Sequence, residues 1–215
     1  MEKDLGNYRK SYEKGALLEI AISDNPMELF QRWFHEVDTH FQQNETNAMT
    51  LSTFGLDGFP KSRVVLLKKY TFEGFIFYTN YESEKGKAMT ANPKVCLSFH
   101  WAAAERQVII KGSAEKIAAN LSDGYFESRP KGSQLGAIAS NQSSVIANRE
   151  VLETKLKSLE AEYENKEITR PEFWGGFIVK PIEIEFWQGR ANRLHDRIRY
   201  QLQADYSWKI ERLAP

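Results

Sequence analysis

AMTLSTF at residues 48–54 opens a series of five short runs, and this series decides the expected fold of the 215-residue chain. The other runs are RVVLLKKY (63–70), GFIFYTN (74–80), KVCLSFHW (94–101) and RQVIIKG (106–112). Each run is rich in β-branched and aromatic residues, and Gly, Pro, Asn and Asp separate the runs. Five strands at such close spacing predict an antiparallel barrel.

Helices are expected on either side of these strands. Asn25-Pro26 predicts the start of a helix, whose buried face would comprise Phe30, Phe34, Val37 and Phe41. SEKGKAMTAN (83–92) predicts a short helix capped by Ser83. Asn148 is the expected cap of a third helix, whose buried stripe would comprise Leu152, Leu156, Leu159 and Tyr163.

The C-terminal part returns to strands in FWGGFIVKPIEIEFWQG (173–189), LHDRIRYQL (194–202) and SWKIERL (207–213). No repeat or linker divides the chain. We therefore expect a flexible polar arm over residues 1–24, followed by one domain over residues 25–215. The predicted class is α+β: one antiparallel barrel with helices packed outside it.

Composition limits the function. Lys plus Arg and Asp plus Glu both number 29, so no overall positive field favours nucleic acid, and any phosphate site must be local. The N-terminus lacks an apolar core, which predicts a cytoplasmic protein without a membrane segment. The single Cys96 is expected in the core rather than as a reactive thiol. The four histidines lack ligand-like spacing, so no metal site is expected.

Three segments carry candidate chemistry. Arg63 and Lys68 bound an apolar strand and either bind an anion or simply reach solvent. YFESRPKGSQLGAIASNQSS (125–144) spaces a Tyr, an Arg and a Ser by four residues, which suits a phosphate but also a solvated helix face. EFWQGRANRLHDRIRY (185–200) concentrates planar and cationic groups that suit a flat anionic ligand.

Together these segments resemble the pyridoxine/pyridoxamine 5′-phosphate oxidase family, from about Tyr8 to the C-terminal WKIERLAP. The most specific pieces, in order, are RVVLLK, FYTN, ERQV, YFESRPKGSQLGA, FWGGF, and FWQG followed by RLHDR. The resemblance implies an FMN-binding split β-barrel that forms a homodimer with FMN at the subunit interface. It implies oxidation of pyridoxamine or pyridoxine 5′-phosphate to pyridoxal 5′-phosphate, with O2 reduced to H2O2.

The resemblance also implies site residues. The implied FMN contacts are Arg63, Val64, Val65, Leu66, Leu67, Lys68, Tyr78, Thr79, Lys85, Gln107, Gln142, Ser143, Trp187 and Arg197. The implied substrate-phosphate contacts are Lys68, Tyr125, Arg129 and Ser133. Arg193 and His195 match the family's pair over the pyridine ring and are the implied catalytic residues.

Two features stay open. Arg9 and Tyr12 match residues that close over the substrate in this family, whereas composition alone would make them a mobile tail. Many members have Ser-Arg-Lys where this chain has Ser83-Glu84-Lys85, so Glu84 either faces solvent or weakens FMN binding.

Two other functions compete with the oxidase. A split barrel of this type could bind flavin without oxidase activity, although YFESRP and RLHDR argue against that. A barrel of five short strands could also bind oligonucleotides, although the zero net charge argues against that.

Overall fold

The computed structural model describes residues 2–41 and 43–215. They form two compact units, which we name by their place in the chain. The terminal unit comprises Met1–Met49, Leu97–Lys111 and Pro181–Pro215, and the middle unit comprises Thr50–Cys96 and Gly112–Lys180. The prediction of a single domain after residue 24 stays a prediction.

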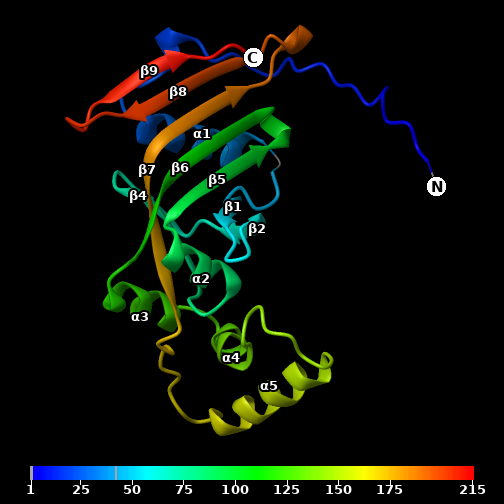
Figure 1. The fold of residues 1–215 in the computed structure, drawn as a ribbon, viewed down its shortest axis with the longest axis vertical. Coiled ribbons are helices and arrows are strands. Elements are labelled where there is room, and N and C mark those ends of the chain that lie inside the picture. The colour runs from blue at the N-terminus through cyan, green and yellow to red at the C-terminus, as the bar shows by residue number, and fades with distance from the viewer. Residues whose placement is uncertain (1, 42) are drawn as a thin grey trace. The chain divides into compact units, whose positions relative to one another are not determined.

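The strands follow the order β2-β1-β5-β6-β7-β4-β3, and β8 adds to β7 and β9 to β8 (Figure 1). Their bounds are β1 Ala48–Phe54, β2 Pro60–Leu66, β3 Lys69–Thr71, β4 Gly74–Asn80, β5 Lys94–Trp101, β6 Arg106–Lys116, β7 Trp174–Gln188, β8 Asp196–Leu202 and β9 Trp208–Arg212. The pairs β3–β4, β4–β7, β7–β8 and β8–β9 are antiparallel. β1, β4 and β5 have the predicted bounds.

One predicted strand is wrong. RVVLLKKY divides into β2, which ends at Leu66, and β3, which begins at Lys69. The break lies at Leu67-Lys68, where Leu67 enters the core and the Lys68 amide donates to the Ile76 carbonyl of β4 at 2.8 Å. The chain thus changes its hydrogen-bonding partner within one apolar run, and no spacing in the sequence marks such a change.

In the terminal unit, α1 (Pro26–His40) packs against the strands. Asn25 caps the helix as predicted, because its side chain accepts from the Met27 amide at 2.9 Å. Phe30 and Val37 are fully buried, whereas Phe34 and Phe41 are half-buried. Leu29 and Trp33 complete the face instead, and the Trp33 ring meets the Phe186 ring of β7 edge-on at 5.2 Å. This contact fixes the helix on the last part of β7.

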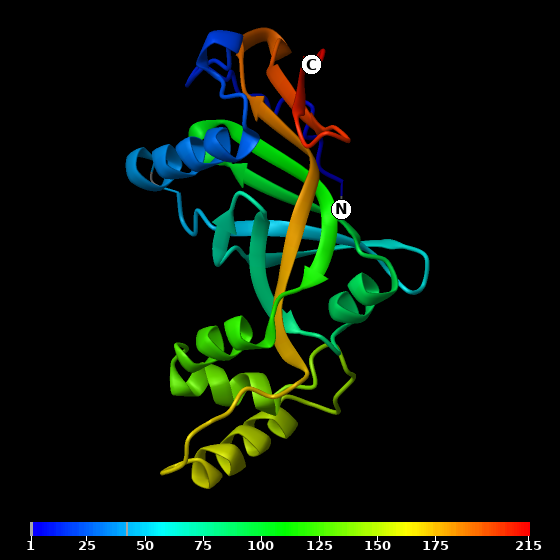
Figure 2. The ribbon, with the colours of Figure 1, turned by 90° about the vertical axis from the view of Figure 1, so that its left-hand side faces the viewer.

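The middle unit holds α2 (Glu84–Ala91), α3 (Ala119–Glu127), α4 (Lys131–Ala139) and α5 (Glu150–Glu162). Figure 2 shows α3, α4 and α5 gathered at one end of this unit. Ser83 caps α2 as predicted, since its hydroxyl accepts from the Gly86 amide at 3.3 Å. Three short 3-10 turns, η1 (Glu19–Ala21), η2 (Ala102–Ala104) and η3 (Ala191–Arg193), belong to the terminal unit among the described residues.

Two predictions of burial are wrong. α5 contains no buried residue, and its leucine stripe is only half-buried, because α5 contacts chiefly α4 along one side. Cys96 is half-buried rather than a core residue, because it alternates with the buried Val95 and Leu97 and so faces the other side of β5. Every helix among residues 2–41 and 43–215 is too short or too polar to cross a lipid bilayer.

A buried carboxylate joins the two ends of the chain inside the terminal unit. Asp196 accepts from the Leu17 amide at 3.0 Å, from Arg190 at 2.7 Å and from Arg212 at 2.9 Å. Burial alone would raise the pKa of Asp196, but the Leu17 amide and the two guanidinium groups outweigh burial and lower it. The charged form is therefore the stabilising one.

We expect Asp196→Ala to lower the free energy of unfolding by about 2–3 kcal/mol, because it leaves these donors without their acceptor. Denaturant titration at neutral pH measures the loss. Asp38→Ala, which removes an exposed aspartate of α1, is the control. Since the folded pKa is depressed, the Asp196 contribution is present above about pH 4 and fades as the pH falls through the folded pKa. A loss that persists unchanged at acidic pH would contradict the assignment.

Candidate functional site

A cavity of about 540 Å³ opens in the middle unit, and we call it the middle cavity. Strands β2 and β4, helices α2, α3 and α4, and the first residue of β7 contribute to its wall. The lining residues are Val64, Val65, Leu66, Lys68, Tyr78, Thr79, Asn80, Lys85, Tyr125, Arg129, Pro130, Ser133, Gly136, Ala137, Ser140, Gln142 and Trp174.

Two glycines in β7 make room for neighbouring tyrosines, one of which lines this cavity. Tyr78 and Thr79 of β4 lie opposite Gly176 and Gly175. A Cβ on Gly176 would approach a Tyr78 ring carbon to 3.0 Å, and a Cβ on Gly175 would clash with the Tyr81 hydroxyl at 2.1 Å. Gly176 therefore leaves room for Tyr78 in the wall of this cavity, whereas Gly175 accommodates Tyr81, which does not line it.

Three aromatic rings form a stack in this wall. The Tyr78 and Tyr125 centroids are 3.9 Å apart with planes 19° from parallel, and the Trp174 ring lies 5.6 Å from Tyr78. The Arg129 guanidinium lies 4.7 Å from the Trp174 centroid, which is within the range of a cation–π contact. The stack thus joins β4, α3 and β7 and holds Arg129 at its end.

The middle cavity is prepared for an anion. Its lining residues include Lys68, Lys85 and Arg129 and, among the described residues, no carboxylate. Arg129 Nη1 is buried and lacks a hydrogen-bond partner in residues 2–41 and 43–215. Burial lowers the pKa of Arg129, and burial together with the nearby Arg63 lowers the pKa of Lys85. An anion would restore the balance, since it would pair with the charged forms that burial disfavours.

A second depression of about 410 Å³, which we call the α2 hollow, shares Lys85 with the middle cavity. Its lining residues are Lys61, Ser62, Arg63, Glu84, Lys85 and Ser143. Lys85 donates to the Gln142 side chain at 2.7 Å, and the Arg63 guanidinium donates to Thr53 Oγ1 at 2.8 Å. Glu84 lines the hollow and pairs with Lys61 there. The carboxylate that departs from the family pattern therefore has a cation of its own.

The terminal unit has a cavity of about 650 Å³, the terminal cavity. Its lining residues are Tyr8, Arg9, Lys10, Ser11, Tyr12, Trp187, Arg190, Asn192, Arg193 and His195. The Tyr12 ring meets both the Trp187 and the His195 ring edge-on at 5.7 Å. The Arg190 amide donates to His195 Nδ1 at 3.1 Å, so the neutral imidazole carries its proton on Nε2.

The structure sorts the predicted site residues into these places. The middle cavity and the α2 hollow bring together Arg63, Val64, Val65, Leu66, Lys68, Tyr78, Thr79, Lys85, Tyr125, Arg129, Ser133, Gln142 and Ser143. The terminal cavity brings together Arg9, Tyr12, Trp187, Arg193 and His195.

Three predicted residues line none of these cavities. Leu67 lies in the core, 4% exposed. Arg197 makes a two-pronged ion pair with Glu185 at 2.8 and 3.1 Å. Gln107 is half-buried on β6. Conversely, Trp174 and Arg190 line cavities although neither was predicted as a site residue; they lie in the runs FWGGF and EFWQGR.

Two family models match separate parts of the chain. Residues 36–162 match the family model "Pyridoxamine 5'-phosphate oxidase", and residues 174–215 match "Pyridoxine 5'-phosphate oxidase C-terminal dimerisation region". The chain is 68% identical to a pyridoxine/pyridoxamine 5′-phosphate oxidase of Flavobacterium psychrophilum, over 99% of this chain and all of that one. It is 57% identical to one of Christiangramia forsetii over both full lengths.

Among solved structures, PhzG from Burkholderia lata in complex with tetrahydrophenazine-1-carboxylic acid matches with a TM-score of 0.87 and 28% identity, over 96% of this chain and all of that chain. An FMN-binding protein from Nostoc punctiforme, related to pyridoxamine 5′-phosphate oxidase, matches with a TM-score of 0.69 and 12% identity, over 91% of this chain and all of that chain. These matches confirm the predicted α+β split-barrel fold. The sequence and family matches show that the chain belongs to the pyridoxine/pyridoxamine 5′-phosphate oxidase family.

Proposed function

We propose that the chain is an FMN-dependent oxidase that converts pyridoxamine or pyridoxine 5′-phosphate to pyridoxal 5′-phosphate, with O2 reduced to H2O2. The observation that carries the proposal is the buried Arg129 Nη1 without a partner, in a cavity of cations and stacked rings. A phosphorylated aromatic substrate supplies both an anion for the guanidinium and a ring for the stack. Release of peroxide when pyridoxamine 5′-phosphate is added to the purified protein tests it. A flavin-containing protein that releases none would favour the binding protein without oxidase activity.

The residues present fit FMN. Arg63 and Lys85 offer two cations to its phosphate in the α2 hollow, and Ser143 adds a hydroxyl. Lys85 also lies at the start of α2, where the first backbone amides favour an anion. The side chains of Thr79 and Gln142, which hydrogen-bond to each other at 3.3 Å, offer polar contacts for the flavin edge. When bound, FMN supplies the redox chemistry: it takes two electrons from the substrate and passes them to O2.

The chain's own residues bind and orient the substrate. Lys68, Arg129 and Ser133, with the Tyr125 hydroxyl, hold its phosphate. This remote grip fixes the reacting carbon, so binding energy is converted into orientation. Arg193 and His195 hold the pyridine ring. His195 donates a hydrogen bond to the substrate from its Nε2–H, because its Nδ1 already accepts from the Arg190 amide. Arg9 and Tyr12 cover the ring and exclude water.

A homodimer is part of the proposal. The matched C-terminal dimerisation region, residues 174–215, contains Trp187, Arg193, His195 and Arg197. Residues of a dimerisation region face a second copy, so we infer that the terminal unit of one subunit completes the middle cavity of its partner, with FMN at the interface. The Glu185 carboxylate holds the Arg197 guanidinium in place beside this interface.

We expect Arg129→Ala to raise the Michaelis constant for pyridoxamine 5′-phosphate by about ten- to a hundredfold, because it removes a charge-assisted phosphate contact worth about 1.5–3 kcal/mol. Flavin content should stay unchanged. Steady-state peroxide production and the flavin absorption of the purified protein measure the two effects. The control is Arg149→Ala, which removes an exposed arginine beside α5. Loss of FMN with an unchanged Michaelis constant would move Arg129 to the cofactor site.

We expect Glu84→Gln to tighten FMN binding about fivefold at low salt, because a carboxylate in the α2 hollow opposes the phosphate by about 1 kcal/mol at 4 Å in water. Added salt should shrink the difference. FMN titration of the flavin-free proteins at two salt concentrations measures it, with the exposed Glu73→Gln as control. Equal dissociation constants would mean that Lys61 keeps the field of Glu84 away from the phosphate.

We expect a mixed dimer of Arg129→Ala and His195→Ala subunits to recover about half of the wild-type activity. One of its two sites then takes an intact Arg129 from one subunit and an intact His195 from the other, whereas the second site carries both substitutions. Two different affinity tags allow the mixed dimer to be purified. Each variant alone is the control and should be nearly inactive when assayed at a pyridoxamine 5′-phosphate concentration far below the Michaelis constant of Arg129→Ala. A mixed dimer as inactive as its parents would place both residues of a site in one chain.

A further inference from the structure

Glu105 is a buried acid that neither candidate cavity includes. It ends the turn η2, is 3% exposed, and has left-handed backbone angles of φ 55° and ψ 41°. Left-handed backbone is costly for a residue other than glycine, and so is a carboxylate withdrawn from water. Both costs call for partners that hold the residue in place.

Those partners come from the N-terminal arm. Glu105 Oε2 accepts from the backbone amides of Glu13 at 2.8 Å and Lys14 at 3.0 Å, and Oε1 pairs with the Lys10 ammonium at 3.1 Å. Burial alone would raise the pKa of Glu105, but the two amides and Lys10 outweigh burial and lower it. Lys14 also donates to the Ala103 carbonyl at 2.7 Å. The arm is therefore fastened on both sides of Tyr12.

Glu105 also fastens the segment that Tyr12 faces. Its backbone carbonyl accepts from the Gly189 amide at 2.8 Å and from the Gln188 side chain at 3.2 Å. Gly189 begins the segment that leads to His195, and a Cβ on Gly189 would approach the Tyr12 side chain to 2.8 Å. One residue thus holds both walls of the terminal cavity through its carboxylate and its carbonyl.

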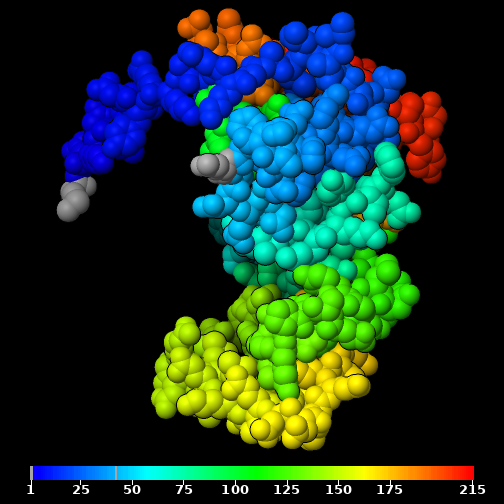
Figure 3. All heavy atoms as spheres, turned by 180° about the vertical axis from the view of Figure 1, so that it is seen from behind, coloured from blue at the N-terminus to red at the C-terminus, as the bar shows by residue number. Residues whose placement is uncertain are grey.

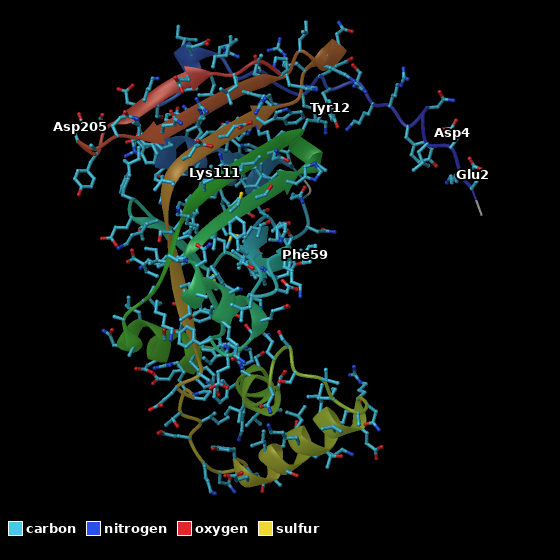
Figure 4. All side chains as sticks on the ribbon, viewed as in Figure 1. Glu2, Asp4, Tyr12, Phe59, Lys111 and Asp205 are labelled. Atoms are coloured by element: carbon cyan, nitrogen blue, oxygen red, sulfur yellow. The ribbon has the colours of Figure 1, made fainter. Side chains whose placement is uncertain are left out.

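The first residues of the arm lie away from the rest of the terminal unit. In Figure 3 the first residues of the arm, in dark blue, run clear of the other atoms of the terminal unit. In Figure 4 Glu2 and Asp4 lie on this free end, whereas Tyr12 lies beside the segment that follows β7. Tyr12 is half-buried, while residues 2–11 are exposed. The burial of the arm therefore starts within the segment that Glu105 binds.

We propose that Glu105 is a positioning residue: its carboxylate fastens residues 10–14 as a strap that places Arg9 and Tyr12 against Trp187 and His195. This inference rests on the proposed function, because the strap then sets the affinity for the substrate's pyridine ring. Glu105 touches neither substrate nor FMN in this role. The strap is built before the substrate arrives, so the arm does not have to be ordered during binding.

Hydrogen exchange of the holoprotein tests the fastening without reference to activity. Glu105→Asn suits the left-handed backbone but is shorter and uncharged. The amides of Glu13 and Lys14 should then exchange about tenfold faster or more, because each loses a charge-assisted bond. Glu211→Gln, which removes the charge of a β9 acid paired with Arg199 and Lys209, is the control and should change nothing. Unchanged exchange at these two amides would overturn the inference.

Kinetics test the consequence for the substrate. Glu105→Asn should raise the Michaelis constant for pyridoxamine 5′-phosphate about tenfold, with kcat within about twofold. In an Arg9→Ala/Tyr12→Ala background the same substitution should add less than about twofold, because the strap then has neither side chain to place. A defect that multiplies equally in both backgrounds would be a general structural effect and would overturn the proposal.

A second variant covers a failure of Glu105→Asn to fold. Lys10→Met removes the ammonium of a side chain that is 61% exposed. It should speed hydrogen exchange at the Glu13 and Lys14 amides and raise the Michaelis constant by about two- to fivefold. No effect on either would overturn the proposal. Protein that exchanges as expected but has no oxidase activity in any form would retain the strap and overturn the proposed function instead.

Discussion

Both candidate sites depend on the hydrogen-bond ladders of one strand, β7. Its first part pairs with β4 from Trp174 to Val179, and its last part pairs with β8 from Glu183 to Gln188. The first ladder sets Gly175 and Gly176 opposite Thr79 and Tyr78, which creates the aromatic wall of the middle cavity. The second aligns Trp187 with Arg197 and ends where the terminal cavity begins. A slip of one residue in either ladder would turn these side chains to the opposite face of the sheet.

Electrostatics then decides what the middle cavity accepts. The chain as a whole carries no net charge, yet this cavity gathers three cations, and burial lowers the pKa of two of them, Lys85 and Arg129. A protein gains no stability from a buried guanidinium nitrogen without a partner, because burial removes its water and gives nothing in return. The cavity therefore has an excess of positive charge, and an anionic ligand stabilises the folded state when it binds.

Local patterns predicted much of the fold and of the middle site. β1, β4 and β5 follow from runs of strand-forming residues, and Asn25 and Ser83 follow from capping chemistry. The break between β2 and β3 at Leu67-Lys68 could not be predicted from local patterns, because it depends on which strand the Lys68 amide pairs with. Glu105 was missed for the same reason: its carboxylate binds the arm about ninety residues earlier in the chain, and no spacing encodes that contact. Resemblance assigned Gln107, and the cationic run EFWQGRANRLHDRIRY together with the resemblance suggested Arg197; none of the three cavities described above includes either residue.

The fold by itself does not select the substrate. PhzG, which matches this chain at a TM-score of 0.87, was crystallised with a tricyclic carboxylic acid, so related split barrels accept flat anions of more than one kind. A carboxylate carries one negative charge, whereas a phosphate monoester carries nearly two at neutral pH. Lys68 and Arg129 lie together in the middle cavity with the hydroxyls of Tyr125 and Ser133, and these two cations match a phosphate better than a carboxylate. On the proposed function, the cations that line this cavity, rather than the shape of the sheet, would favour a phosphorylated substrate.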